Sequence, residues 1–165
     1  MMRKIVTGIM TLGLLMSASP SFAALDLELT QGFDGASPLA IVPFDNEVAP
    51  NALSEIVNAD LGNSGRFRVL AKAKLPENPH QVAEVHTEVW KSLGMDYVVL
   101  GKVSQAGNQV HVSFQLVDMY GHKGALLDKT YSASQADSRM LAHHISDEIY
   151  EKLIGKKGAF STHIA

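Results

Sequence analysis

The sequence contains no cysteine. This absence excludes disulfides, Cys-ligated zinc sites, iron–sulfur clusters and thiol nucleophiles. The chain also lacks an uninterrupted apolar run of about 18 residues, which a transmembrane helix of ordinary length requires. Basic residues number 14 against 17 acidic ones, so the basic excess typical of nucleic-acid-binding proteins is missing as well. The 165 residues fit one domain with accessory segments.

Residues 1–23 have the three parts of a secretory signal peptide. Arg3 and Lys4 form a basic start, an uncharged, mostly apolar run extends from residue 5 to residue 16, and small residues end at Ala23. We predict cleavage between Ala23 and Ala24, export to the periplasm, and no stable membrane insertion afterwards. Because the leader holds two of the 14 basic and none of the 17 acidic residues, the remaining chain has a net charge of −5.

Residues 24–37 are predicted to form an extended tail. Leu25, Leu27 and Leu29 alternate with polar residues, which is the period of a β-strand. Pro38 ends any ladder of hydrogen bonds at that point. One short strand is not stable alone, so the tail must pair with something. A binding partner that receives an added strand and an edge of the chain's own sheet both fit the pattern, which does not separate them.

Residues 38–158 are expected to form an α/β (α+β) domain, a mixed sheet of about five strands with helices packed against it. Alternating or continuous apolar runs predict strands at 39–44, 67–71, 97–100, 110–116 and 125–133. Helical spacing of apolar residues predicts helices at 51–61, 82–93 and 134–153. The run 97–100 is apolar on both sides, which indicates a central strand.

Candidate catalytic and metal-ligating residues are few. On the last predicted helix, His143 faces Asp147 and His144 faces Glu148 four residues further along. Adjacent helical residues point about 100° apart, which disfavours a metal ion shared by the two histidines. The glycine-rich turns match none of the phosphate-binding motifs. We therefore predict no catalytic residue, no metal ligand and no cofactor, and we expect the protein not to be an enzyme.

Several segments, taken in chain order, resemble the TolB family of the Tol–Pal system. They include the runs LELTQG, ASPLAIVPF, ADLGNSGRF, WKSLGMDYVVLG, QLVD, AHHISDEIYEKL and GKKGAF, at residues 27–32, 36–44, 59–67, 90–101, 115–118, 142–153 and 155–160. The resemblance implies a non-enzymatic periplasmic protein that serves outer-membrane integrity and invagination of the envelope at cell division.

The resemblance also implies a partner, because the amino-terminal segment of TolB proteins binds the carboxy-terminal domain of TolA. By position, this segment would comprise Ala24, Leu25, Asp26, Leu27, Glu28, Leu29, Thr30, Gln31, Gly32, Phe33, Asp34 and Gly35. Backbone pairing over residues 25–30 would fit the alternation described above.

The family's second domain is a β-propeller, which binds the lipoprotein Pal, and no blade follows in this sequence. Pal binding therefore has no candidate residue in this chain. We interpret residues 159–165 as a linker toward the missing propeller and expect it to be disordered, with Phe160 and Ile164 lacking a partner surface.

A second interpretation stays open at this point. The apolar runs at 39–44 and 97–101 also look like domains of curli-export and flagellar-assembly accessory proteins. The chain would then be a structural domain of another envelope assembly.

Overall fold

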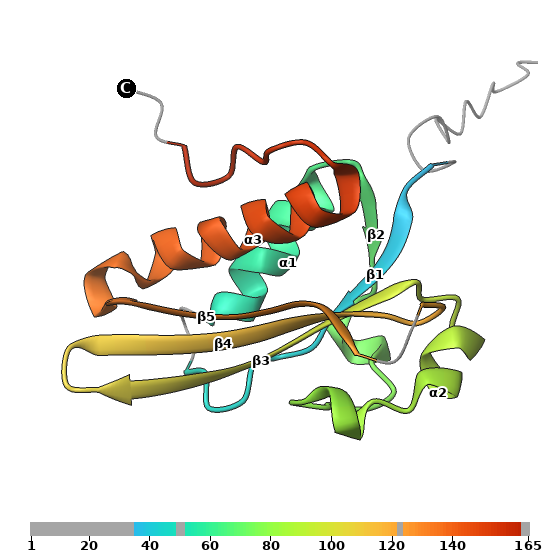
Figure 1. The fold of residues 1–165 in the computed structure, drawn as a ribbon, viewed down its shortest axis with the longest axis horizontal. Helices are drawn as coiled ribbons and strands as arrows, with labels where there is room; N and C mark the ends of the chain where they lie inside the picture. Colours follow the sequence, from blue (N-terminus) through green and yellow to red (C-terminus); the bar gives the residue numbers. More distant parts are fainter. Residues whose placement is uncertain (1–34, 49–51, 122–123, 163–165) are drawn as a thin grey trace, which may run out of the picture.

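A computed structural model describes residues 35–48, 52–121 and 124–162 (Figure 1). One mixed sheet contains five strands in the order β2-β1-β3-β4-β5. The strands are β1 (Ser37–Ile41), β2 (Phe67–Val69), β3 (Tyr97–Ala106), β4 (Gln109–Asp118) and β5 (Ala125–Ser134). The helices are α1 (Leu53–Asn63), α2 (Thr87–Ser92) and α3 (Ser138–Ile154), with short 3-10 turns at Lys72–Lys74, Val82–Glu84 and Gln135–Asp137. The predicted α+β class and mixed sheet are confirmed.

Strand β1 has a parallel neighbour on each side. Ser37 pairs with Phe67 at the start of β2, and Leu39 pairs with Tyr97 at the start of β3. The expectation that Pro38 ends a ladder is wrong, because Pro38 lies within β1 and pairs with Arg68. Strands β3, β4 and β5 continue as antiparallel hairpins. The predicted central position of residues 97–100 is confirmed, because β3 is the middle strand of the five. Parallel neighbours need crossover connections, and α1 supplies the one between β1 and β2.

Helices α1 and α3 cover one face of the sheet (Figure 1). The apolar helical spacing predicted over 134–153 is confirmed on α3, where Leu141, Ile145 and Ile149 are buried and Leu153 is partly buried. None of the helices in the described part of the chain is long and apolar enough to cross a bilayer.

The opposite face of β1 and β3 is covered by residues 70–95 around Trp90. The single helix predicted over 82–93 is wrong, because a 3-10 turn and the six-residue α2 replace it. Trp90 is fully buried, whereas the nearby Val89 and Leu93 are 40% and 44% exposed. Burial of the indole therefore decides which side of α2 meets the sheet.

The carboxylate of Glu77 holds this segment in place. It accepts hydrogen bonds from the Trp90 indole N–H at 2.6 Å and from the His86 backbone N–H at 3.0 Å. The His86 Nδ1 atom lies 2.6 Å from its other oxygen. Burial raises the pKa of Glu77, but these hydrogen bonds outweigh it and hold the pKa below its ordinary value.

Residue 51, where the sequence predicts this helix to start, lies outside the described residues, and α1 begins at Leu53. The residue before the helix, Ala52, makes no side-chain cap bond. Instead, the carboxylate of Glu47 accepts hydrogen bonds from the backbone N–H of Ser54, at 3.0 Å, and from its hydroxyl. A preceding loop thus supplies the anion that the amino end of the helix favours.

We predict that Gly101→Ala lowers the free energy of unfolding by about 1–3 kcal/mol, because overpacking a tight core is costly. A Cβ atom at Gly101 would lie 2.7 Å from the ring of Phe44, which is 2% exposed. Gly62→Ala in α1 is the control: its Cβ would meet only Val69, at 3.7 Å, and alanine favours the helix. Urea unfolding in which Gly101→Ala matched or exceeded the parent would contradict this packing.

We predict that Glu77→Gln destabilises the protein by about 1–2 kcal/mol at pH 7, since it weakens charge-assisted hydrogen bonds. The pKa of Glu77 is lowered in the fold, so its contribution is present above the ordinary value of 4.5 and is lost as the pH falls below it. The difference between parent and variant should therefore shrink on acidification. Urea unfolding followed by fluorescence of the single tryptophan measures it. Glu88→Gln, at an 88% exposed side chain, is the control, and a difference that stayed constant with pH would refute the assignment.

Candidate interaction site

The predicted partner-binding tail reaches the described part of the chain only at Gly35, an exposed residue in a turn. Its other eleven candidate residues, 24–34, lie outside the described residues. The structure does describe the first residues of β1, which follow the predicted tail in the chain. We call the paired residues Ser37 and Phe67 the tail root. The Ser37 N–H donates to the carbonyl of Arg66 at 3.1 Å, which fixes the first residue of β1.

The neighbours of β1 begin level with its own first residues. Phe67, the first residue of β2, pairs with Ser37, and Tyr97, the first residue of β3, pairs with Leu39. Because both neighbours run parallel to β1, no described strand lies alongside the chain just before Ser37. A strand that extended β1 backwards would therefore have both of its edges open.

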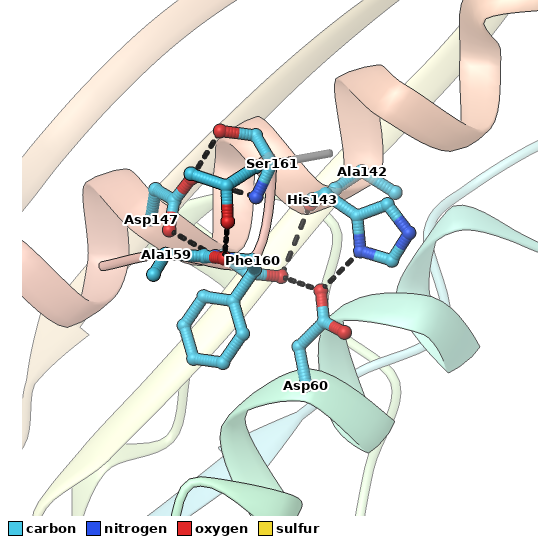
Figure 2. Close-up of polar contacts among 9 residues, drawn as sticks. Asp60, Ala142, His143, Asp147, Ala159, Phe160 and Ser161 are labelled. Atoms are coloured by element: carbon cyan, nitrogen blue, oxygen red, sulfur yellow. Dashed lines mark hydrogen bonds and ion pairs between the residues drawn. The ribbon is translucent and has the colours of Figure 1, made fainter. Parts of the chain in front are cut away.

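The end of the described chain lies on α3, where one carboxylate accepts its hydrogen bonds (Figure 2). We call residues 158–162 the C-terminal strap. Asp147 accepts the backbone N–H of Phe160 on Oδ1 at 2.9 Å. Its Oδ2 accepts the N–H of Ser161 at 3.1 Å and the hydroxyl of Ser161 at 2.5 Å. The strap passes so close that a Cβ on Gly158 would lie 2.2 Å from Oδ1 of Asp147. Glycine is therefore required at that position.

The ring of Phe160 meets the domain through other aromatic rings. It lies edge-on to Tyr150, with ring centroids 5.7 Å apart, and Tyr150 lies edge-on to Phe67 at 6.1 Å. The expectation that Phe160 lacks a partner surface is wrong, and the expected disorder is wrong for residues 159–162. Residues 163–165, with Ile164, lie outside the described residues. The sequence could not reveal this packing, because the partners of Phe160 are distant in the chain.

A second carboxylate joins the two helices. His143 Nδ1 lies 2.8 Å from Oδ2 of Asp60 on α1 (Figure 2). The hydroxyl of Ser146 donates to the same oxygen at 2.7 Å. Ser146 is fully buried, so Asp60 satisfies a hydroxyl that would otherwise be isolated from water. The predicted contact of His143 with Asp147 is wrong. Helical spacing places two residues on one face, but it does not reveal a better partner on another helix.

The second histidine behaves as predicted. His144 Nε2 lies 3.9 Å from Glu148 Oε1 and its ring lies edge-on to Tyr131 at 5.0 Å. Glu148 has a closer partner in Lys129 of β5, whose Nζ donates to it at 2.7 Å. That hydrogen bond and the positive charge hold the pKa of Glu148 below its ordinary value. The pair ties α3 to the edge strand.

The polar side chains of this region bond to one another and to the backbone. In the described ranges, no group of three or more His, Asp or Glu residues could hold a metal ion. A hollow of about 350 Å³ lies between the strap and the start of α3, bordered by Met140, His143 and Phe160. Sequence reasoning missed Asp60 and the role of Asp147, and the only signal for the latter is the glycine at 158. The arrangement positions chain segments and joins α1, α3 and the strap.

We predict that His143→Ala destabilises the protein by about 1–2 kcal/mol, because it leaves Asp60 with one partner fewer at a helix interface. His144→Ala is the matched control on the adjacent residue. Its side chain is 46% exposed, against 19% for His143, so its loss should cost about 0.5 kcal/mol or less. Urea unfolding compares the two variants. Equal destabilisation, or a larger effect at His144, would contradict the bridging role of His143.

Known proteins match this chain over most of its length. The TolB amino-terminal domain matches residues 25–125. The Tol-Pal system protein TolB of Legionella pneumophila (strain Corby) is 43% identical over 142 residues, which cover 86% of this chain and 33% of the relative. That of Nitrosococcus oceani is 40% identical over 164 residues, which cover 97% of this chain and 38% of the relative.

The fold agrees with these sequence matches. The crystal structure of TolB from Acinetobacter baumannii aligns with a TM-score of 0.68 at 36% identity, over 78% of this chain and 31% of that one. The chain thus spans about a third of the length of the relatives it matches. The family match, the identities near 40% and the shared fold together show that this chain belongs to the TolB amino-terminal domain family of the Tol–Pal system.

Proposed function

We propose that this chain is a non-enzymatic interaction module of the Tol–Pal system that binds the carboxy-terminal domain of TolA through residues 24–35. It acts in the periplasm, in outer-membrane integrity and in invagination of the envelope during cell division. The observation that carries the proposal is the extent of the family match, which begins at residue 25, inside the proposed binding segment. The segment is therefore part of what this chain shares with the family.

The geometry of the tail root supports the proposal. Strand β1 is paired on both sides, with β2 and with β3. Both neighbours begin level with its first residues, so neither extends alongside the chain that precedes Ser37. A strand formed by residues before Ser37 would need a neighbouring strand to pair with, and no described strand continues beside it in line with β1. The partner's sheet can supply such an edge by strand addition.

The residue pattern of the tail supports the same mode of binding. In strand addition, main-chain hydrogen bonds give most of the affinity and alternate side chains give specificity. Leu25, Leu27 and Leu29 would point to one side and the acidic side chains between them to the other. We place Pal binding outside this chain, on the propeller that the family resemblance implies.

The test is a calorimetric titration of residues 24–165 with the TolA carboxy-terminal domain, run beside a chain that begins at Gly35. We expect binding by the longer chain only. A third protein, in which residues 24–34 are replaced by a Gly/Ser sequence of equal length, controls for the presence of a tail of any kind. Equal binding by the longer chain and either control would place the binding site elsewhere and refute the proposal.

The mode of binding is tested at Leu27. We expect Leu27→Pro to weaken binding at least about tenfold more than Leu27→Ala, because proline removes a backbone donor and alanine does not. Equal losses would indicate that side-chain burial, not main-chain pairing, gives the affinity. The fold itself should be unchanged in both variants, since residue 27 precedes β1.

A further inference from the structure

We propose that the C-terminal strap is coupled to the tail root through three aromatic rings, so that undocking the strap loosens the start of β1. The rings belong to Phe160, Tyr150 and Phe67, which lie in the strap, in α3 and in β2. The strap and Ser37 lie near opposite ends of the described chain. The inference goes beyond the proposed function, because it holds whether or not the tail binds TolA.

First, the strap docks on α3 and undocks from it as a unit. It is held at two places, the carboxylate of Asp147 and the ring of Tyr150. Asp147 receives donors from two successive residues, Phe160 and Ser161, so its three hydrogen bonds form or break together. A short segment held by few side chains belongs to the low-stability end of a structure and opens locally.

The second step is the packing of the rings. Phe160 meets Tyr150 at an interplanar angle of 77° and Tyr150 meets Phe67 at 85°, so each ring presents its edge or face to the next. Tyr150 is only partly buried and Phe67 is 2% exposed. Removal of Phe160 therefore uncovers the middle ring and lets it move. In a close-packed interior, movement of the Tyr150 ring displaces the side chain packed against it, which is Phe67.

The third step leads from Phe67 to the root. Phe67 is the register partner of Ser37, and the residue before it, Arg66, accepts the N–H of Ser37 at 3.1 Å. Strand β2 has three residues and stands at the edge of the sheet, where β1 is its one neighbour among the described strands. A displacement of Phe67 thus acts directly on the hydrogen bond that fixes Ser37.

Two substitutions remove the two attachments of the strap one at a time. Asp147→Asn replaces one acceptor oxygen by an amide that cannot accept the strap's donors. Phe160→Ala keeps the Asp147 hydrogen bonds and removes the ring. Glu151→Gln changes an exposed acid on the same helix and is the matched control for charge. Tyr150→Phe keeps the middle ring and is the matched control for packing.

Amide hydrogen exchange measured by NMR on the full chain tests the coupling. The amides of Phe160 and Ser161 report on the strap, and that of Ser37 reports on the root. The Val103 amide, which donates to Asp45 at 2.8 Å in another part of the sheet, is the reference.

We expect Asp147→Asn to speed exchange of the strap amides at least about tenfold, and both Asp147→Asn and Phe160→Ala to speed Ser37 at least about threefold. Val103 should change by less than about 1.5-fold, and both control variants should match the parent throughout.

Three results would overturn the proposal. Fast strap amides with an unchanged Ser37 would show that the strap opens without affecting the root. Strap amides that exchange as in the parent in both variants would show that these contacts do not hold the strap. Equal acceleration of Ser37 and Val103 would show a general loss of stability in place of a specific connection.

Discussion

Strand β1 is enclosed on four sides, and the rest of the domain is arranged around it. It has a parallel strand at each edge, α1 and the α3 side of the core against one face, and the Trp90 cluster against the other. Leu39 and Ala40, which point to opposite faces, are both fully buried. Parallel pairing of this kind forces the connections of the chain across the faces of the sheet. The crossovers therefore provide the same layers that bury β1.

This enclosure gives the proposed tail a fixed origin. Residues that precede Ser37 are attached to β1. That strand cannot shift without disturbing its pairing with β2 and β3 and the packing on both faces of the sheet. A binding segment attached to such a strand is held at one end while its edges are unoccupied by described strands. The carboxyl end of the described chain is also held in place, because Asp147 on α3 accepts hydrogen bonds from the strap. Both ends of the described chain are thus positioned by the same few elements.

Sequence patterns predicted the sheet well, because the spacing of apolar residues follows directly from which faces of a strand are buried. Alternation over 110–116 marked β4, and a run that is apolar on both sides marked β3 as central. The pattern failed over 82–93, where hydrogen bonds from Trp90 and His86 to Glu77 replaced a regular helix. It also failed for His143 and Phe160, whose partners Asp60 and Tyr150 are set by tertiary packing. Spacing along one helix carries no information about such distant partners.

We propose that the backbone of residues 25–30 pairs as an added strand with the TolA carboxy-terminal domain. In such a strand, the N–H groups of alternate residues face the partner and the others face away. The most direct measurement is the affinity of two synthetic peptides of residues 24–35, one N-methylated at Leu25, Leu27 and Leu29 and the other at Asp26, Glu28 and Thr30. Because the Leu27 N–H is expected to pair with the partner, methylation at Leu25, Leu27 and Leu29 should abolish binding, while methylation at Asp26, Glu28 and Thr30 should leave it close to that of the unmodified peptide. Equal affinity of the two peptides would contradict it.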